Sequence, residues 1–175
     1  MSRNLLIFGY GFIGGAFAEA ARAAGYEIAA TARTPEKRKA LMAQGLTAID
    51  PANHDALGQA IRNAGTLLIT PAPDDDGCPA FAVLSGFDLS DKWIGYLSTT
   101  GVYGDRNGGW VFEDSVLRPT STEGRRRVRA ENQWLSAGAH TFRLPGLYGP
   151  GRNVIERLMD GTARRIHKPG HVFSR

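Results

Sequence analysis

Residues 4–14 read NLLIFGYGFIG, a short apolar run followed at once by a turn that contains three glycines. The apolar run is typical of a buried parallel strand, and the alanine-rich stretch after the turn is typical of a helix. The turn has the spacing G-x-G-x-x-G: the first glycine permits a tight bend, the second lets backbone approach a pyrophosphate, and the third allows close helix packing. We therefore expect a dinucleotide phosphate site formed by Gly9, Gly11, Phe12, Ile13 and Gly14.

Short apolar runs alternate with amphipathic stretches along the rest of the chain, which predicts βαβ units and a parallel sheet. The expected fold class is α/β, a Rossmann-type doubly wound parallel sheet with helices on both faces. Residues 79–90 are left undecided between helix and coil. Residues 1–150 are expected to form the NAD(P)-binding Rossmann domain, and residues 151–175 the start of an incomplete substrate lobe. The predicted strands are 4–8, 26–31, 46–50, 66–70, 93–98 and 140–144, and the predicted helices 12–24, 35–44, 55–63, 123–137 and 153–160.

The bulk composition favours one soluble domain. The 175 residues are 42% hydrophobic, contain one cysteine and open with no signal-like segment, so we expect a cytoplasmic protein without a membrane partner. Basic residues concentrate after position 117, which would suit an anionic ligand, a nucleic acid or an acidic covering surface. We do not expect nucleic acid, because the arginine-rich stretch STEGRRRVRAE at 121–131 lacks interleaved aromatics and a reading element. Three adjacent carboxylates at 74–76 are expected to be solvated, and no metal site is predicted.

The second predicted strand indicates the cofactor preference. Sites that prefer NAD hold the ribose 2′-hydroxyl with an acidic residue about 20 residues after the glycines. Here the segment reads ATARTPEKR, and Arg33 stands just past the strand, where a guanidinium can pair with a 2′-phosphate. We therefore predict NADP as the cofactor, with NAD as the alternative.

Two further motifs, STTGVYGD at 98–105 and FRLPGLYGPGRN at 142–153, resemble hallmarks of the extended short-chain dehydrogenase/reductase superfamily, the NAD(P)-dependent epimerases and dehydratases. The resemblance implies that Thr99 is the catalytic Ser/Thr that hydrogen-bonds the reacting oxygen. Thr100 and Gly101 replace the Asp-Glu pair of the sugar-nucleotide dehydratases, so dehydration by that pair is not expected. By the same resemblance, the residues near the cofactor are Asp50 at the adenine, Pro71, Ala72 and Pro73 at the ribose, and Pro145 at the nicotinamide.

The superfamily's proton-transfer pair, Tyr-x-x-x-Lys, has no match in this chain. If Glu131 is aligned with the acidic residue that commonly follows the lysine, Glu123 occupies the tyrosine position and Arg127 the lysine position. An arginine can bind a ribose or phosphate but does not readily release a proton, and a solvated glutamate is a poor acid at neutral pH. A helix capping box with Thr120 and an i,i+4 pair with Arg127 together explain Glu123 without catalysis. Tyr103 is either a substitute acid or a packed residue at the strand end.

Two functions follow from these residues. The first is hydride transfer between NADP(H) and a hydroxyl or carbonyl of a phosphorylated or nucleotide-linked substrate, with Thr99 orienting the oxygen and Arg127 holding the ribose. The second is a non-catalytic NADP(H) sensor that has lost the Tyr/Lys pair. The expected partners are the dinucleotide and a small, anionic substrate, and a homodimer is left open.

Overall fold

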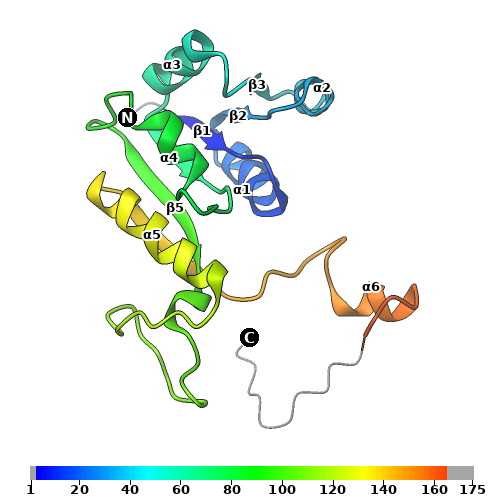
Figure 1. Cartoon of the computed structure of the whole chain (residues 1–175). Helices are drawn as coiled ribbons and strands as arrows, with labels where there is room; N and C mark the ends of the chain where they lie inside the picture. The colour runs from blue at the N-terminus through cyan, green and yellow to red at the C-terminus, as the bar shows by residue number, and fades with distance from the viewer. Residues whose placement is uncertain (1–2, 165–175) are drawn as a thin grey trace.

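The computed structural model describes residues 3–164. Within that range the chain forms one six-stranded parallel sheet in the order β3-β2-β1-β4-β5-β6 (Figure 1). This order is that of the doubly wound Rossmann fold, in which the connections reverse direction beside β1. The strands are β1 Asn4–Phe8, β2 Glu27–Thr31, β3 Thr47–Ile49, β4 Thr66–Ile69, β5 Trp93–Thr99 and β6 His140–Leu144.

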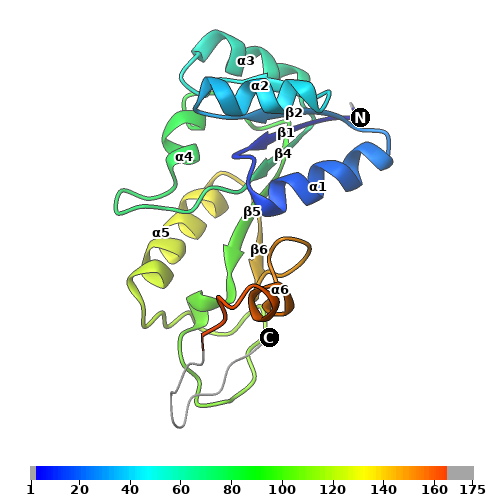
Figure 2. The ribbon, with the colours of Figure 1, turned by 90° about the vertical axis from the view of Figure 1, so that its right-hand side faces the viewer.

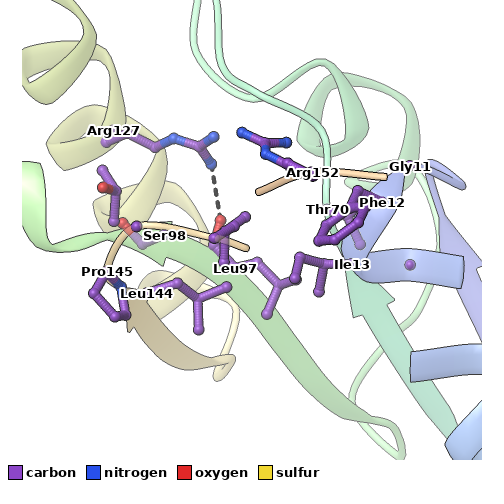
Figure 3. A pocket seen from close by; sticks show the side chains of 14 residues that line it. Gly11, Phe12, Ile13, Thr70, Leu97, Ser98, Arg127, Leu144, Pro145 and Arg152 are labelled. Atoms are coloured by element: carbon purple, nitrogen blue, oxygen red, sulfur yellow. Dashed lines mark hydrogen bonds between the residues drawn. The ribbon is translucent and has the colours of Figure 1, made fainter. Parts of the chain in front are cut away.

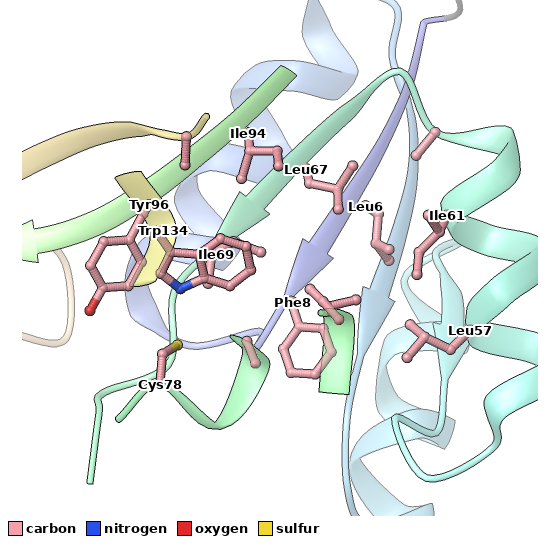
Figure 4. Packing of buried hydrophobic residues seen from close by; sticks show 14 of the residues in the cluster. Leu6, Phe8, Leu57, Ile61, Leu67, Ile69, Cys78, Ile94, Tyr96 and Trp134 are labelled. Atoms are coloured by element: carbon pink, nitrogen blue, oxygen red, sulfur yellow. The ribbon is translucent and has the colours of Figure 1, made fainter. Parts of the chain in front are cut away.

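Helices cover both faces of the sheet, as the sequence predicts (Figure 2). Alternate residues of β1 enter two separate cores, because successive side chains of a strand point to opposite faces. The helices are α1 Phe12–Ala23, α2 Pro35–Ala43, α3 His54–Asn63, α4 Pro79–Leu84, α5 Thr122–Ser136 and α6 Val154–Met159. Leu5 and Ile7 pack toward α1 and α2, while Leu6 and Phe8 pack toward α3, α4 and α5; Figure 4 shows the second of these cores.

The predicted bounds of β1 and β6 are confirmed, and every other predicted end either agrees or differs by one residue. The undecided segment 79–90 contains α4, six residues that begin at a proline. A 3₁₀ helix, η1, spans Thr100–Tyr103 and was not predicted. The predicted capping box at α5 is wrong: Ser121 is the cap, and its hydroxyl accepts from the Gly124 N–H at 3.0 Å. The serine has the same capping chemistry as the expected threonine but lies one residue later in the chain.

The segment after β6 contains a helix that buries none of its residues. The segment forms a short antiparallel bridge between Gly149 and Arg152, followed by this helix, α6. The predicted substrate lobe 151–175 lies partly outside the described residues, so the division at residue 150 stays a prediction. No helix within residues 3–164 combines the length and apolarity that crossing a lipid bilayer requires.

Candidate functional site

A pocket of about 380 Å³ opens where the carboxyl ends of β1, β4, β5 and β6 meet (Figure 3). In open parallel α/β sheets, ligands bind in the crevice at this end of the strands. Several predicted site residues that are far apart in sequence meet here, together with others that were not predicted. The lining residues are Gly11, Phe12, Ile13, Gly14, Thr70, Leu97, Ser98, Thr99, Arg127, Leu144, Pro145, Gly146, Leu147 and Arg152.

The glycine loop forms one side of the pocket, and each glycine meets a different demand. Gly9 has a φ of 88°, which an L side chain rarely adopts. A Cβ on Gly14 would lie 2.9 Å from the carbonyl oxygen of Gly9, so this position must stay bare for α1 to pack. A Cβ on Gly11 would meet nothing within 4 Å, and Gly11 is the N-cap of α1 without a side-chain cap. The start of α1 is therefore open to the pocket and suited to a phosphate.

Two threonines hold this loop in place, and neither was identified as a site residue from the sequence. The Gly9 N–H donates to the Thr31 hydroxyl at 2.9 Å, while the Thr70 hydroxyl donates to the Gly9 carbonyl. Thr31 ends β2 and Thr70 follows β4, so the strands on either side of β1 both brace the turn. The sequence signal that was available is a threonine at the carboxyl end of each neighbouring strand.

Arg127 lies across the pocket from the glycine loop (Figure 3), and Thr99 lines the same pocket. The Thr99 hydroxyl accepts a hydrogen bond from the Gly101 N–H at 3.2 Å, which leaves its own proton to donate. Arg127 Nη1 donates to the Leu97 carbonyl at 2.8 Å and to the Tyr96 hydroxyl at 3.2 Å. These bonds fix the guanidinium against β5 while it faces the pocket.

Tyr96 supports Arg127 without reaching the pocket lining. Its ring is fully buried beside Trp134 in the core that α5 covers (Figure 4). Burial raises the pKa of Tyr96 to about 12, although the positive charge of Arg127 acts in the opposite direction. The phenol is therefore protonated at neutral pH, and its oxygen serves Arg127 as a hydrogen-bond acceptor.

A buried ionic cluster lies behind the strand ends. Glu131 is 0% exposed and accepts a hydrogen bond from the Ser98 hydroxyl at 2.5 Å. Arg143 of β6 donates to the same carboxylate through Nη2 at 2.9 Å and through Nε at 3.1 Å. The hydrogen bond to Glu131 is the main cause that raises the pKa of Arg143, so this arginine remains charged. Ser98 lines the pocket, and Glu131 therefore positions one wall of it.

Tyr103 and Glu123 lie outside this lining. The Tyr103 hydroxyl accepts from Arg143 Nη1 at 2.8 Å, and the guanidinium carbon lies 5.0 Å from the centre of the tyrosine ring. Tyr103 is thus packed at the strand end, one of the two alternatives for this residue. Glu123 is exposed in the first turn of α5, and Arg127 reaches β5 instead of pairing with it. The catalytic roles considered for Tyr103 and Glu123 stay predictions.

Asp50, expected at the adenine, and Arg33, expected at the 2′-phosphate, lie outside this pocket lining, past the ends of β3 and β2. Arg38 pairs with Asp50 at 2.9 Å and donates to the carbonyls of Ala32 and Arg33 at 2.9 and 2.8 Å. The side chain of Arg33 itself is exposed just past β2. Asp50 is therefore engaged by Arg38, while the Arg33 guanidinium is accessible to a ligand.

The segment 71–78, which includes Pro71, Ala72 and Pro73, is tied to α5. Asp75 pairs with Arg126 at 2.7 Å and its carbonyl accepts from Arg129. The Cys78 N–H donates to the Gln133 side chain at 2.9 Å. Two arginines of the basic stretch therefore hold a loop of their own chain, and Arg127 faces the pocket.

Comparisons with known proteins support the fold. Residues 4–63 match a protein-family model described as NADP oxidoreductase, coenzyme F420-dependent. The structure superimposes on a conserved protein of unknown function from Silicibacter pomeroyi with a TM-score of 0.85 and 41% identity, covering 98% of this chain and 62% of that one. The chain has a Rossmann-type NAD(P)-binding fold.

Solved structures of lower sequence identity share the fold with this chain, and the similarity extends no further than the fold. The dTDP-glucose 4,6-dehydratase from Bacillus anthracis, solved with NAD, gives a TM-score of 0.72 at 17% identity over 90% of this chain and 62% of that one. The UDP-glucuronic acid 4-epimerase from Bacillus cereus, also solved with NAD, gives 0.69 at 20% identity over 90% and 63%. The chain thus spans about three fifths of the length of these solved structures. No curated protein sequence matches it.

Proposed function

We propose that the chain binds NADP(H) in the crevice at the strand ends and transfers a hydride between the cofactor and a hydroxyl or carbonyl. The observation that carries the proposal is the open start of α1 at Gly11, which shares one pocket with Thr99 and Arg127. The Gly11 backbone, which has no Cβ, fits a pyrophosphate, and the same pocket carries a hydroxyl donor and a cation. The NAD complexes of the dehydratase and the epimerase, which share the fold, support the same cofactor class.

The preference for NADP rests on Arg33. It is exposed just past β2, where a ribose 2′-phosphate would lie, and no carboxylate stands at that strand end to hold a 2′-hydroxyl. Asp50, which is expected at the adenine, pairs with Arg38. The family model matched by residues 4–63, described as an NADP oxidoreductase, is consistent with this choice.

For the chemistry, bound NADPH would supply a hydride to a carbonyl carbon, and a proton from water would complete the alcohol. Thr99 would donate its hydroxyl proton as a hydrogen bond to the substrate oxygen, where negative charge develops. Arg127 would lie beside the cofactor and keep a fixed positive charge close to that oxygen. Such a site needs no protein acid at the position of Glu123.

Arg33→Asp tests the cofactor assignment. Reversing a charge that pairs with the 2′-phosphate should lower the affinity for NADPH by about 10- to 100-fold and leave the affinity for NADH nearly unchanged. Titration calorimetry with each cofactor measures this difference. Lys39→Asp is the matched control, since it makes the same charge change on the exposed face of α2. Equal losses for NADPH and NADH would refute the phosphate contact.

Thr99→Ala tests the catalytic assignment. With NADPH and a panel of carbonyl substrates, the absorbance of the reduced cofactor reports turnover. Losing one donor to a developing oxyanion should lower kcat by about 100-fold or more without changing cofactor affinity. Thr100→Ala is the control from the next residue. Unchanged turnover in the Thr99 variant would remove its assigned role.

The second candidate, an NADP(H) sensor without catalysis, is favoured by the absence of Tyr103 and Glu123 from the pocket lining among the described residues. It predicts cofactor binding in calorimetry with no consumption of NADPH across the carbonyl panel. Any carbonyl whose NADPH-dependent reduction is lost in the Thr99 variant would exclude it.

A further inference from the structure

Arg152 reaches the pocket from the segment that follows β6, and its position was not predicted. Gly149 and Arg152 exchange backbone hydrogen bonds of 3.0 and 2.9 Å, so the chain turns back on itself here. The turn lies against Phe12, since a Cβ on Gly149 would be 3.1 Å from the tip of that ring. The Arg152 guanidinium lies 5.5 Å from the Phe12 ring centre. Arg152 is thereby held over the first residue of α1.

The turn is braced through its backbone, which leaves the Arg152 side chain available. The Asn153 amide donates to the Gly149 carbonyl at 3.1 Å, and Glu156 accepts from the Gly151 N–H at 3.1 Å. Within residues 3–164 the Arg152 guanidinium lies over the Phe12 ring and donates no hydrogen bond. All five of its N–H donors can therefore meet a ligand.

Arg152 and Arg127 face the same space from opposite sides, as Figure 3 shows. The N-terminus of α1 opens into that space and adds a partial positive charge. No carboxylate is present among the 14 residues that line this pocket. Two guanidinium groups and a helix start thus converge on one volume without a counter-charge from the lining.

We infer that Arg127 and Arg152 together clamp one phosphate-type anion in this pocket. Arginine binds such groups in a planar, two-pronged manner, and a pair on opposite sides can contact different oxygens of one anion. Arg127 is the rigid half, since β5 fixes it, and Arg152 is the half that can adjust. The anion would be either the pyrophosphate of the cofactor or a phosphate carried by the substrate, and the first of these sources rests on the proposed function.

The test compares Arg152→Gln with the wild type, using inorganic pyrophosphate as the probe in titration calorimetry at low salt. Losing the Arg152 contacts should lower the affinity for pyrophosphate by about tenfold. Arg157→Gln removes the same charge from exposed α6 outside the pocket lining and should have little effect. Arg152 is exposed, so its replacement should leave the far-ultraviolet circular dichroism and the thermal midpoint unchanged.

Repeating the titration with NADPH already bound distinguishes the sources. If NADPH abolishes pyrophosphate binding, and NADPH itself weakens in Arg152→Gln, the clamped group belongs to the cofactor. If pyrophosphate still binds beside NADPH and depends on Arg152, the clamp holds a substrate phosphate. Pyrophosphate binding through Arg152 without any NADPH binding would keep the clamp and overturn the proposed function. Equal pyrophosphate affinity in the Arg152 and Arg157 variants would overturn the clamp while leaving NADPH binding intact.

Discussion

Replacing Glu131 by glutamine should test the buried ionic cluster and the pocket wall it positions. The carboxylate is 0% exposed and receives a hydrogen bond from Ser98 and a forked one from Arg143. Glutamine preserves the shape and removes the charge, so Arg143, with a side chain 19% exposed, would lose its counter-ion. Breaking a buried pair by removing one partner costs about 3–5 kcal/mol.

The lower end of that range is expected, because Arg143 keeps its hydrogen bonds to the Tyr103 hydroxyl and to the Glu113 carbonyl. A loss of about 3 kcal/mol in the free energy of unfolding corresponds to a fall of about 6–12 °C in Tm for a chain of this size. Urea unfolding followed by circular dichroism measures it, with an unchanged m-value as the sign that one two-state transition is compared.

Asp75→Asn is the matched control for the same experiment. It removes the charge from the pair with Arg126, in which the aspartate side chain is 80% exposed. Exposed pairs contribute about 1 kcal/mol or less, so this variant should stay close to the wild type. The reasoning is refuted if Glu131→Gln costs no more than Asp75→Asn.

Two further outcomes are expected. The Gly11→Ala variant should unfold like the wild type but lose NADPH affinity in calorimetry, because its Cβ enters the open pocket. Gly14→Ala should lower Tm as well, since its Cβ meets the Gly9 carbonyl at 2.9 Å. The opposite order of stabilities would contradict the loop geometry. For Tyr96, the folded pKa of about 12 exceeds the ordinary value of 10, so the unfolding free energy should be unaffected below pH 10 and fall toward pH 12 by up to about 1.4 kcal/mol per pH unit. Tyr96→Phe should flatten that fall in urea titrations, and an equally steep fall would argue against a buried phenol.

The fold follows from local sequence patterns. The strand–helix alternation and the glycine turn predict the parallel sheet and its two helical layers, because periodicity and turn chemistry are encoded within a few neighbouring residues. The capping of α5 is harder to predict, since Thr120 and Ser121 can both serve and the choice depends on where the preceding chain packs. A Cβ on Gly124 would lie 2.8 Å from that of Pro119 and 2.9 Å from the Gly101 carbonyl, which shows how tightly this corner is fitted.

The site is only partly encoded in local patterns. The glycine loop, Thr99, Arg127 and Pro145 could be placed in it from motifs, and the structure brings them into one pocket. Thr31, Thr70, Glu131 and Arg152 could not, because each acts through a tertiary contact with a residue distant in sequence. A hydroxyl or a charge near a strand end is common in any sequence. Its role can be assigned only when the residues that contact it in the folded structure are known.

The hydrogen bonds that join Thr31 and Thr70 to Gly9 limit how the cofactor preference can be redesigned. Thr31 lies two residues before Arg33, at the strand end where such redesign would concentrate. A library that randomised the whole segment would disturb the hydrogen bond that shapes the phosphate turn, and would lose both cofactors together. Varying Arg33 and its helix-borne neighbours while keeping Thr31 separates the choice between cofactors from the capacity to bind either.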